Sequence, residues 1–186
     1  MKVHKFLLPA VAALLLVAAG CQNAQKVSAQ AAISTAQTAF GPVKAMSEKY
    51  VPDQTAAVEA SINSAQAAYN NGDYAGAFTA AKALPGQITD LATAAKAKKD
   101  EYVKQWNDLS SSLPGLLSSV GTKVSQLAAA HKLPAATNDQ YTSAKSLWDA
   151  ATAAFSNGDV PTAVTDGNSV KEKLLALASA LHIKTS

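Results

Sequence analysis

The sequence of 186 residues contains no arginine, and its 16 basic residues are all lysine. Arginine provides the planar fork that binds phosphate groups and guanine edges through paired hydrogen bonds, whereas lysine provides a point charge. The formal net charge is +3, and it becomes +1 (14 lysines against 13 acidic residues) when Lys2 and Lys5 are removed with the leader described below. A nearly neutral chain without arginine argues against a nucleic-acid partner.

Aromatic residues make up only 6% of the sequence, and there are no β-branched runs with the alternating pattern of strands. Alanine, serine, threonine and lysine dominate instead. These features predict an all-α fold.

The chain has one cysteine, Cys21, which excludes an internal disulfide. Before it, Lys2 and Lys5 precede an apolar run at residues 6–19 that ends in small residues. A helix needs about 20 apolar residues to span a bilayer, so this run is too short. The pattern predicts a secretory signal peptide at residues 1–20, cleaved between Gly20 and Cys21.

Ala18, Ala19 and Gly20 lead directly into Cys21 and resemble a bacterial lipobox. In such signals the cysteine thiol receives a diacylglyceryl group, and the new amino terminus is usually acylated. Leucine is more typical than alanine at the position of Ala18. The resemblance implies a covalent lipid on Cys21 and a short tether at residues 21–25. Two or three acyl chains anchor a protein stably, whereas one holds it marginally.

Gln22 follows the cysteine. By analogy with Gram-negative lipoproteins, in which aspartate at this position commonly causes inner-membrane retention, glutamine implies the outer membrane, with the protein facing the periplasm. In a Gram-positive organism the same anchor implies the outer face of the cell membrane.

Apolar residues at spacings of three and four predict amphipathic helices after the tether. Gly41-Pro42, Leu84-Pro85-Gly86 and Leu113-Pro114-Gly115 interrupt these stripes, so we expect a kink, a break or a helix start there. Asp53 and Asp73 are candidate helix caps. The predicted helices cover residues 26–49, 53–70, 73–95, 113–132, 138–156 and 159–182.

Two similar turns, AAYNNGDYAGA at residues 67–77 and AAFSNGDVPTA at 153–163, are separated by 157 − 71 = 86 positions. The same offset places Tyr69 on Phe155 and Ile62 on Trp148. This pattern predicts a duplicated unit of three antiparallel helices, at residues 26–95 and 113–182. Residues 96–112 would form a connecting helix. Two arrangements remain open, with the units stacked end to end or folded into one six-helix bundle.

The run from Tyr50-Val51-Pro52-Asp53 through helically spaced alanines to Gly72-Asp73-Tyr74 resembles an alanine-rich bacterial lipoprotein family of unknown function. The resemblance covers residues 30–84 and extends less well to 116–170, where Val160 replaces the tyrosine. It implies a lipid-anchored helical hairpin and no activity. The first turn is also similar to a tetratricopeptide turn, but the period of about 34 residues is missing.

No catalytic motif occurs in the sequence, and no catalytic residue is predicted. His131, His182 and Met46 are too widely separated for a ligand motif, so we expect no metal or haem. The lysine-rich segment at residues 96–104 is typical of a solvated helix face. Large aromatic residues either fill an alanine-rich core or line a ligand cleft between the units. The candidate cleft residues are Tyr102, Trp106, Tyr141 and Trp148.

These observations predict a non-catalytic, membrane-anchored helical module that binds or spaces another component of the cell envelope. Its expected partners are membrane lipid through Cys21 and an envelope protein, with no cofactor beyond the lipid. The alternative is a carrier or sensor of a small ligand that uses the aromatic cleft.

Overall fold

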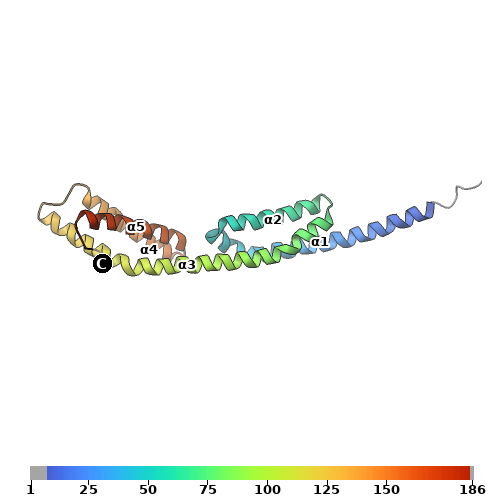
Figure 1. Ribbon diagram of the computed structural model, residues 1–186, viewed down its shortest axis with the longest axis horizontal. Coiled ribbons are helices and arrows are strands. Elements are labelled where there is room, and N and C mark those ends of the chain that lie inside the picture. The colour runs from blue at the N-terminus through green and yellow to red at the C-terminus, as the bar shows by residue number, and fades with distance from the viewer. Residues whose placement is uncertain (1–7, 185–186) are drawn as a thin grey trace, which may run out of the picture. The chain divides into compact units, whose positions relative to one another are not determined.

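The computed structural model describes residues 8–184, and it describes the surroundings of side chains from residue 22 onward. No strand occurs among these residues, so the all-α prediction is confirmed. The five helices are α1 Leu8–Tyr50, α2 Pro52–Asn70, α3 Tyr74–Ala129, α4 Thr137–Ser156 and α5 Val160–Ala180 (Figure 1).

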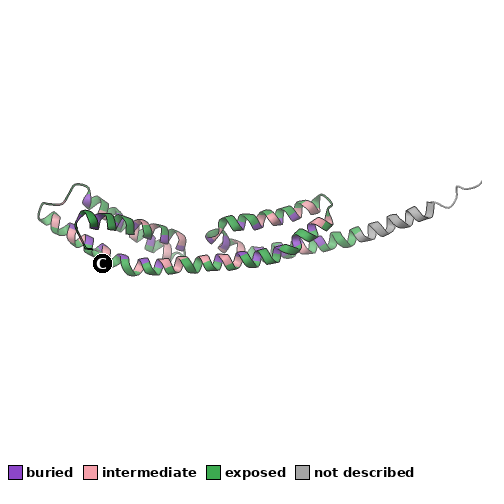
Figure 2. Cartoon of the chain, in the orientation of Figure 1, coloured by how far each residue is buried: buried purple, intermediate pink, exposed green. Residues whose placement is uncertain are grey.

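The chain divides into two compact units, Met1–Lys96 and Ala97–Ser186, and the boundary falls inside α3. In the first unit, α1, α2 and the first part of α3 surround one hydrophobic core. In the second, the last part of α3 packs with α4 and α5 around another. Figure 2 shows the buried residues as a stripe along each helix, which is the pattern that the spacings of three and four predict.

The expected helix start at Leu113-Pro114-Gly115 was wrong, and no helix break occurs at Gly41-Pro42, whereas a kink at Pro42 or Pro85 stays a prediction. Pro42 lies inside α1, and α3 continues without a break through Pro85 and Pro114. All three prolines are exposed. Buried apolar residues lie within four positions on both sides of Pro85 and Pro114, and Pro42 lies between buried Phe40 and half-buried Val43. Proline inside a helix costs about 3 kcal/mol, so core packing before and after each proline must offset that cost. α1 also begins before the predicted residue 26.

Four helices end in the same hydrogen-bonded motif. After α2, the amide of Asp73 donates to the carbonyl of Ala68 at 3.0 Å, and after α4 the amide of Asp159 donates to Ala154 at 2.8 Å. Gly72 follows α2 with a φ of 83°, and Gly158 follows α4 with a φ of 76°. Glycine adopts this left-handed conformation without a Cβ clash.

After α3 and α5 the corresponding left-handed residues are His131 and His182, each with a φ of 55°. Lys132 donates to the carbonyl of Leu127 and Ile183 to that of Ala178, both at 2.8 Å. Histidine is enriched among non-glycine residues with positive φ. Both histidines therefore close helices, which agrees with their predicted places at helix ends.

The two predicted aspartate caps differ in outcome. Asp73 accepts a hydrogen bond from the amide of Gly76 at 2.9 Å, as a cap of α3 should. Asp53 does not cap α2, because α2 begins at Pro52 and Asp53 lies in its first turn. Proline is well suited to the first helical position, where its missing N–H is not needed.

Candidate functional site

The predicted signal peptide at residues 1–20 and the side chain of Cys21 lie outside the residues whose surroundings are described. The backbone of Cys21 belongs to α1, which continues without interruption into the first unit. Across the described residues, no helix combines the length and the apolar character that crossing a bilayer requires.

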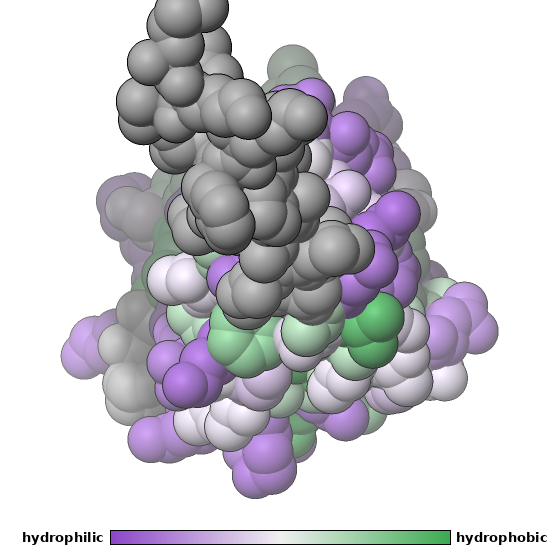
Figure 3. All heavy atoms as spheres, turned by 90° about the vertical axis from the view of Figure 1, so that its right-hand side faces the viewer, coloured by the Kyte–Doolittle hydropathy of each residue, from purple (hydrophilic) through white to green (hydrophobic). Residues whose placement is uncertain are grey.

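An exposed apolar hollow lies where α1 enters the first unit. Its volume is about 470 Å³, and its lining comes from α1 and the end of α2: Lys26, Val27, Gln30, Ala31, Ser34 and Tyr69. Val27 is 70% exposed, the highest value among the large apolar residues that the structure describes. Figure 3 faces this end of the unit and shows hydrophobic surface among hydrophilic surface.

Two tyrosines and a lysine stand beside this hollow. The rings of Tyr69 and Tyr74 meet edge to face with centroids 5.2 Å apart. The Lys26 ammonium lies 5.8 Å from the centroid of the Tyr74 ring, within the range of a cation–π interaction. No sequence pattern pointed to this group of residues.

The structure brings two of the four predicted cleft residues together. Trp106 of α3 stacks on Trp148 of α4, with centroids 5.4 Å apart and planes at 14°. Phe155 of α4, which sequence reasoning did not include, stacks on Trp106 at 4.9 Å. Only 5% of Trp106 is exposed. This stack is part of the core of the second unit and leaves its central ring little access to a ligand.

The other two predicted cleft residues do not join the stack. The Tyr141 hydroxyl donates a hydrogen bond of 3.4 Å to the carbonyl of Leu117, and the ring occupies the space beside Gly121. Tyr102 is half-buried, and the Lys98 ammonium lies 5.2 Å from the centroid of its ring. Tyr141 therefore joins α4 to α3, and Tyr102 packs against the core of the second unit.

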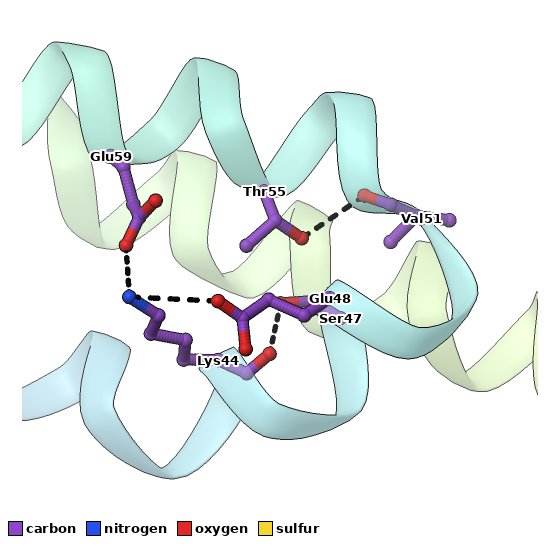
Figure 4. Close-up of polar contacts among 6 residues, drawn as sticks. All are labelled: Lys44, Ser47, Glu48, Val51, Thr55 and Glu59. Carbon is purple, nitrogen blue, oxygen red and sulfur yellow. Dashed lines mark hydrogen bonds and ion pairs between the residues drawn. The ribbon is translucent and has the colours of Figure 1, made fainter.

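A polar cluster joins α1 to α2 near the start of their hairpin (Figure 4). Lys44 of α1 forms an ion pair with Glu59 of α2 and a second one, at 3.6 Å, with Glu48. The hydrogen bond that Lys44 donates to Glu59 raises the pKa of Lys44 above its ordinary value, although partial desolvation acts in the opposite direction. Lys44 thus lies between two carboxylates, one on its own helix and one on α2.

Two buried hydroxyls complete the cluster. Ser47 donates to the carbonyl of Lys44 at 3.0 Å, and Thr55 donates to the carbonyl of Val51 at 3.0 Å. Buried hydroxyls with backbone partners are satisfied and cost little. The whole arrangement fixes the α1–α2 hairpin.

A small groove adjoins this cluster. Its volume is about 180 Å³, below the roughly 300 Å³ at which pockets for drug-sized ligands begin. Apolar side chains form part of it, together with the polar ends of the ion pair and two amides. Its lining residues are Gln37, Phe40, Gly41, Lys44, Glu59, Ile62 and Asn63.

The candidate metal ligands do not form a site in the described part of the chain. His131 and His182 close two helices in the second unit, whereas Met46 lies in α1 of the first. Among the described residues, no group of three or more histidine, cysteine, aspartate or glutamate side chains is placed to hold a metal ion.

No protein-family model, no curated protein and no solved structure matches this chain.

Proposed function

We propose that this protein is a membrane-anchored bacterial lipoprotein whose helical units bind or space another component of the cell envelope without catalysis. The observation behind this proposal is the segment from Lys2 to Cys21, in which a charged start, an apolar run and three small residues precede the only cysteine. In this proposal cleavage before Cys21 leaves a mature amino terminus with a diacylglyceryl group on the thiol and an acyl group on the amine.

Gln22, the residue after the cysteine, supports a location in the outer membrane, facing the periplasm, in a Gram-negative cell. In a Gram-positive cell the anchor holds the domain on the outer face of the cell membrane. The resemblance to alanine-rich lipoproteins of unknown function rests on the run from Tyr50-Val51-Pro52-Asp53 through helically spaced alanines to the Gly72-Asp73-Tyr74 turn.

We further propose that the two helical units arose by duplication. Residues 86 positions apart are buried in both units, as with Ala65 and Ala151 or Ile88 and Leu174. Further pairs with the same offset are Val58 and Ala144, Ala77 and Ala163, Leu84 and Val170, and Leu91 and Leu177.

The first helices of the units support the same proposal at a slightly different offset. In α1 the buried positions include Ala29, Ile33, Ala36 and Phe40, and in α3 they include Leu113, Leu117, Val120 and Val124. These sets share one spacing, with 113 − 29 = 84 and 124 − 40 = 84. The change from 86 to 84 corresponds to the longer connection that precedes α4.

A carrier or sensor function has less support than a binding or spacing function. The proposed aromatic cleft would use Trp106, but that side chain is buried and stacked. The groove beside Lys44 is small, and its ionic groups already have partners.

The experiment that tests the anchor is fractionation of cells that express the full chain or its Cys21→Ala variant. The unchanged chain should sediment with membranes and resist extraction by high salt, because acyl chains hold it by burial of methylene groups. The variant should move to the soluble fraction or be retained as an unprocessed precursor. If both chains were fully processed and both stayed in the membrane fraction at high salt, the lipid anchor would be disproved.

Crosslinking in living cells, followed by mass spectrometry, tests the binding function. One dominant envelope protein that disappears when an exposed face is altered would identify the partner. Saturable binding of a small envelope metabolite without any protein crosslink would favour the carrier.

A further inference from the structure

We propose that the end of the first unit where α1 enters lies directly on the membrane surface, with Val27 and Lys26 facing the lipid headgroups. This inference rests on the proposed lipidation of Cys21. It adds a second contact with the bilayer, made by the folded unit itself.

The anchor lies close to the folded unit. α1 includes Cys21 and continues from it into the unit, and each residue of a helix advances by 1.5 Å. Val27 therefore lies about 9 Å along the axis from Cys21, and Ala29, the first buried residue after the anchor, lies about 12 Å from it. The interfacial layer of a leaflet is about 5–7 Å thick, so Val27 lies at the outer, headgroup side of this layer. A lipid on Cys21 thus brings the end of the unit to the membrane surface.

The connection between the anchor and the unit is stiff. Residues 22–28 are all exposed, yet they continue α1 without a break. A flexible linker of this length would let the unit turn away from the surface, whereas a helix transmits the position of its start. The unit therefore presents the same end to the bilayer.

The side chains at that end of the unit suit a membrane surface. An exposed valine beside a tyrosine-lined hollow provides apolar surface, and tyrosine is enriched at membrane interfaces. Lys26 can keep its ammonium among the headgroups while its methylene groups lie along the apolar surface. One lysine near an anionic surface adds attraction, so phosphatidylglycerol should strengthen the contact.

The occupant of the hollow is therefore lipid. Two other large apolar residues on described helices are exposed, Phe78 of α3 at 38% and Leu175 of α5 at 41%. Leu175 belongs to the second unit and has no such connection to the anchor. It serves as an internal comparison.

The test uses the full lipidated chain in vesicles of phosphatidylcholine and phosphatidylglycerol, with the unlipidated Cys21→Ala chain in solution as reference. An amine-reactive reagent that cannot cross membranes labels lysines, and mass spectrometry measures the labelling of each. Lys26 should be labelled at least fivefold more slowly in the vesicles. The exposed lysines Lys145 and Lys171 of the second unit should change less than twofold.

A matched pair of variants separates contact from proximity. Val27→Asp places a charge in the hollow and should restore most of the labelling of Lys26. Ser28→Asp adds the same charge at an exposed position outside the hollow and should leave Lys26 protected. Both variants retain Cys21, so both should carry the lipid.

The outcomes for this inference and for the anchor differ. A lipidated chain in which Lys26 is labelled as fast as in solution would overturn the membrane contact and leave the anchor intact. If the labelling of Lys26 recovered equally in Val27→Asp and Ser28→Asp, the membrane contact would also be overturned. A specific contact through Val27 predicts recovery in Val27→Asp alone. A chain without lipid on Cys21 would overturn the proposed function itself.

Discussion

The two units use the same turns and fill their cores differently. The first unit packs alanine and aliphatic side chains around Phe40, whereas the second places a stack of two tryptophans and a phenylalanine among smaller residues. In the second unit, Gly167 of α5 faces this stack, and a Cβ there would lie 2.9 Å from Leu109. The absence of a side chain at Gly167 of α5 thus leaves space for Leu109 and the Trp106 ring of α3.

This difference teaches that turn chemistry and core volume can vary separately. The turns determine where each helix ends, while the core composition determines how closely the helices approach. The following predictions test the turns and the cores separately, in decreasing order of their expected effect on stability.

The largest effect should come from Trp106→Ala, which removes the central ring of the stack. Loss of a buried tryptophan costs about 3–5 kcal/mol of unfolding free energy. Both tryptophans of the chain lie in the second unit, so Trp148 remains as a fluorescent reporter of that unit in a urea titration.

Circular dichroism reports on all helices and provides the comparison for Trp106→Ala. If the account is right, the fluorescence transition shifts strongly to lower urea concentration. A shift below 1 kcal/mol would show that the stack contributes little to the second core.

An intermediate effect should come from Gly72→Ala and Gly158→Ala. Both glycines have positive φ, and neither has an atom within 4 Å of the place a Cβ would take. The cost is then that of the left-handed conformation alone, about 1–2 kcal/mol for each. Urea unfolding should give equal losses, although the surrounding cores differ.

Gly86→Ala is the matched control, because this glycine also has open space but lies inside a helix with ordinary φ and is not followed by proline. It should stabilise the protein by about 0.5–1 kcal/mol. Losses that differ by more than twofold between Gly72→Ala and Gly158→Ala would contradict the separation of turn and core.

The smallest effect concerns the ion pairs. In the first unit Lys44 binds Glu59 of another helix, whereas in the second Lys98 binds Glu101 three residues away, at 2.8 Å. The hydrogen bond to the glutamate raises the pKa of each lysine above 10.5. A raised lysine pKa means that the stabilisation is complete below pH 10.5 and is lost as the pH rises through the folded-state pKa.

Melting temperatures between pH 9 and pH 12 test this sign. The wild type should lose stability faster than Lys44→Met over this range, because only the wild type has that charge to lose. Lys98→Met should differ less from the wild type, because its pair joins no second helix. A larger pH effect for Lys98→Met would be inconsistent with the role of the Lys44 cluster.

The sequence predicted most of the fold for identifiable reasons. The N-G-D turns contain the glycines that positive φ requires, so the ends of α2 and α4 could be placed within one residue. The prolines at positions 42 and 114 misled the prediction, since local propensity does not show that they lie on exposed faces with core residues on both sides.

The candidate sites were harder to predict. Trp106 and Trp148 were recognised as a pair, but the spacing of residues cannot show whether a ring fills a core or lines a cleft. The hollow around Val27 was missed because its residues come from two helices, and each alone resembles an ordinary apolar stripe.

Mass spectrometry of the amino-terminal peptide, purified from the membranes of a bacterial host, tests the central claim most directly. The account predicts that the mature chain starts at Cys21, with a diacylglyceryl group on its sulfur and an acyl group on its amine. A peptide in which Gly20 still precedes an unmodified Cys21 would contradict it.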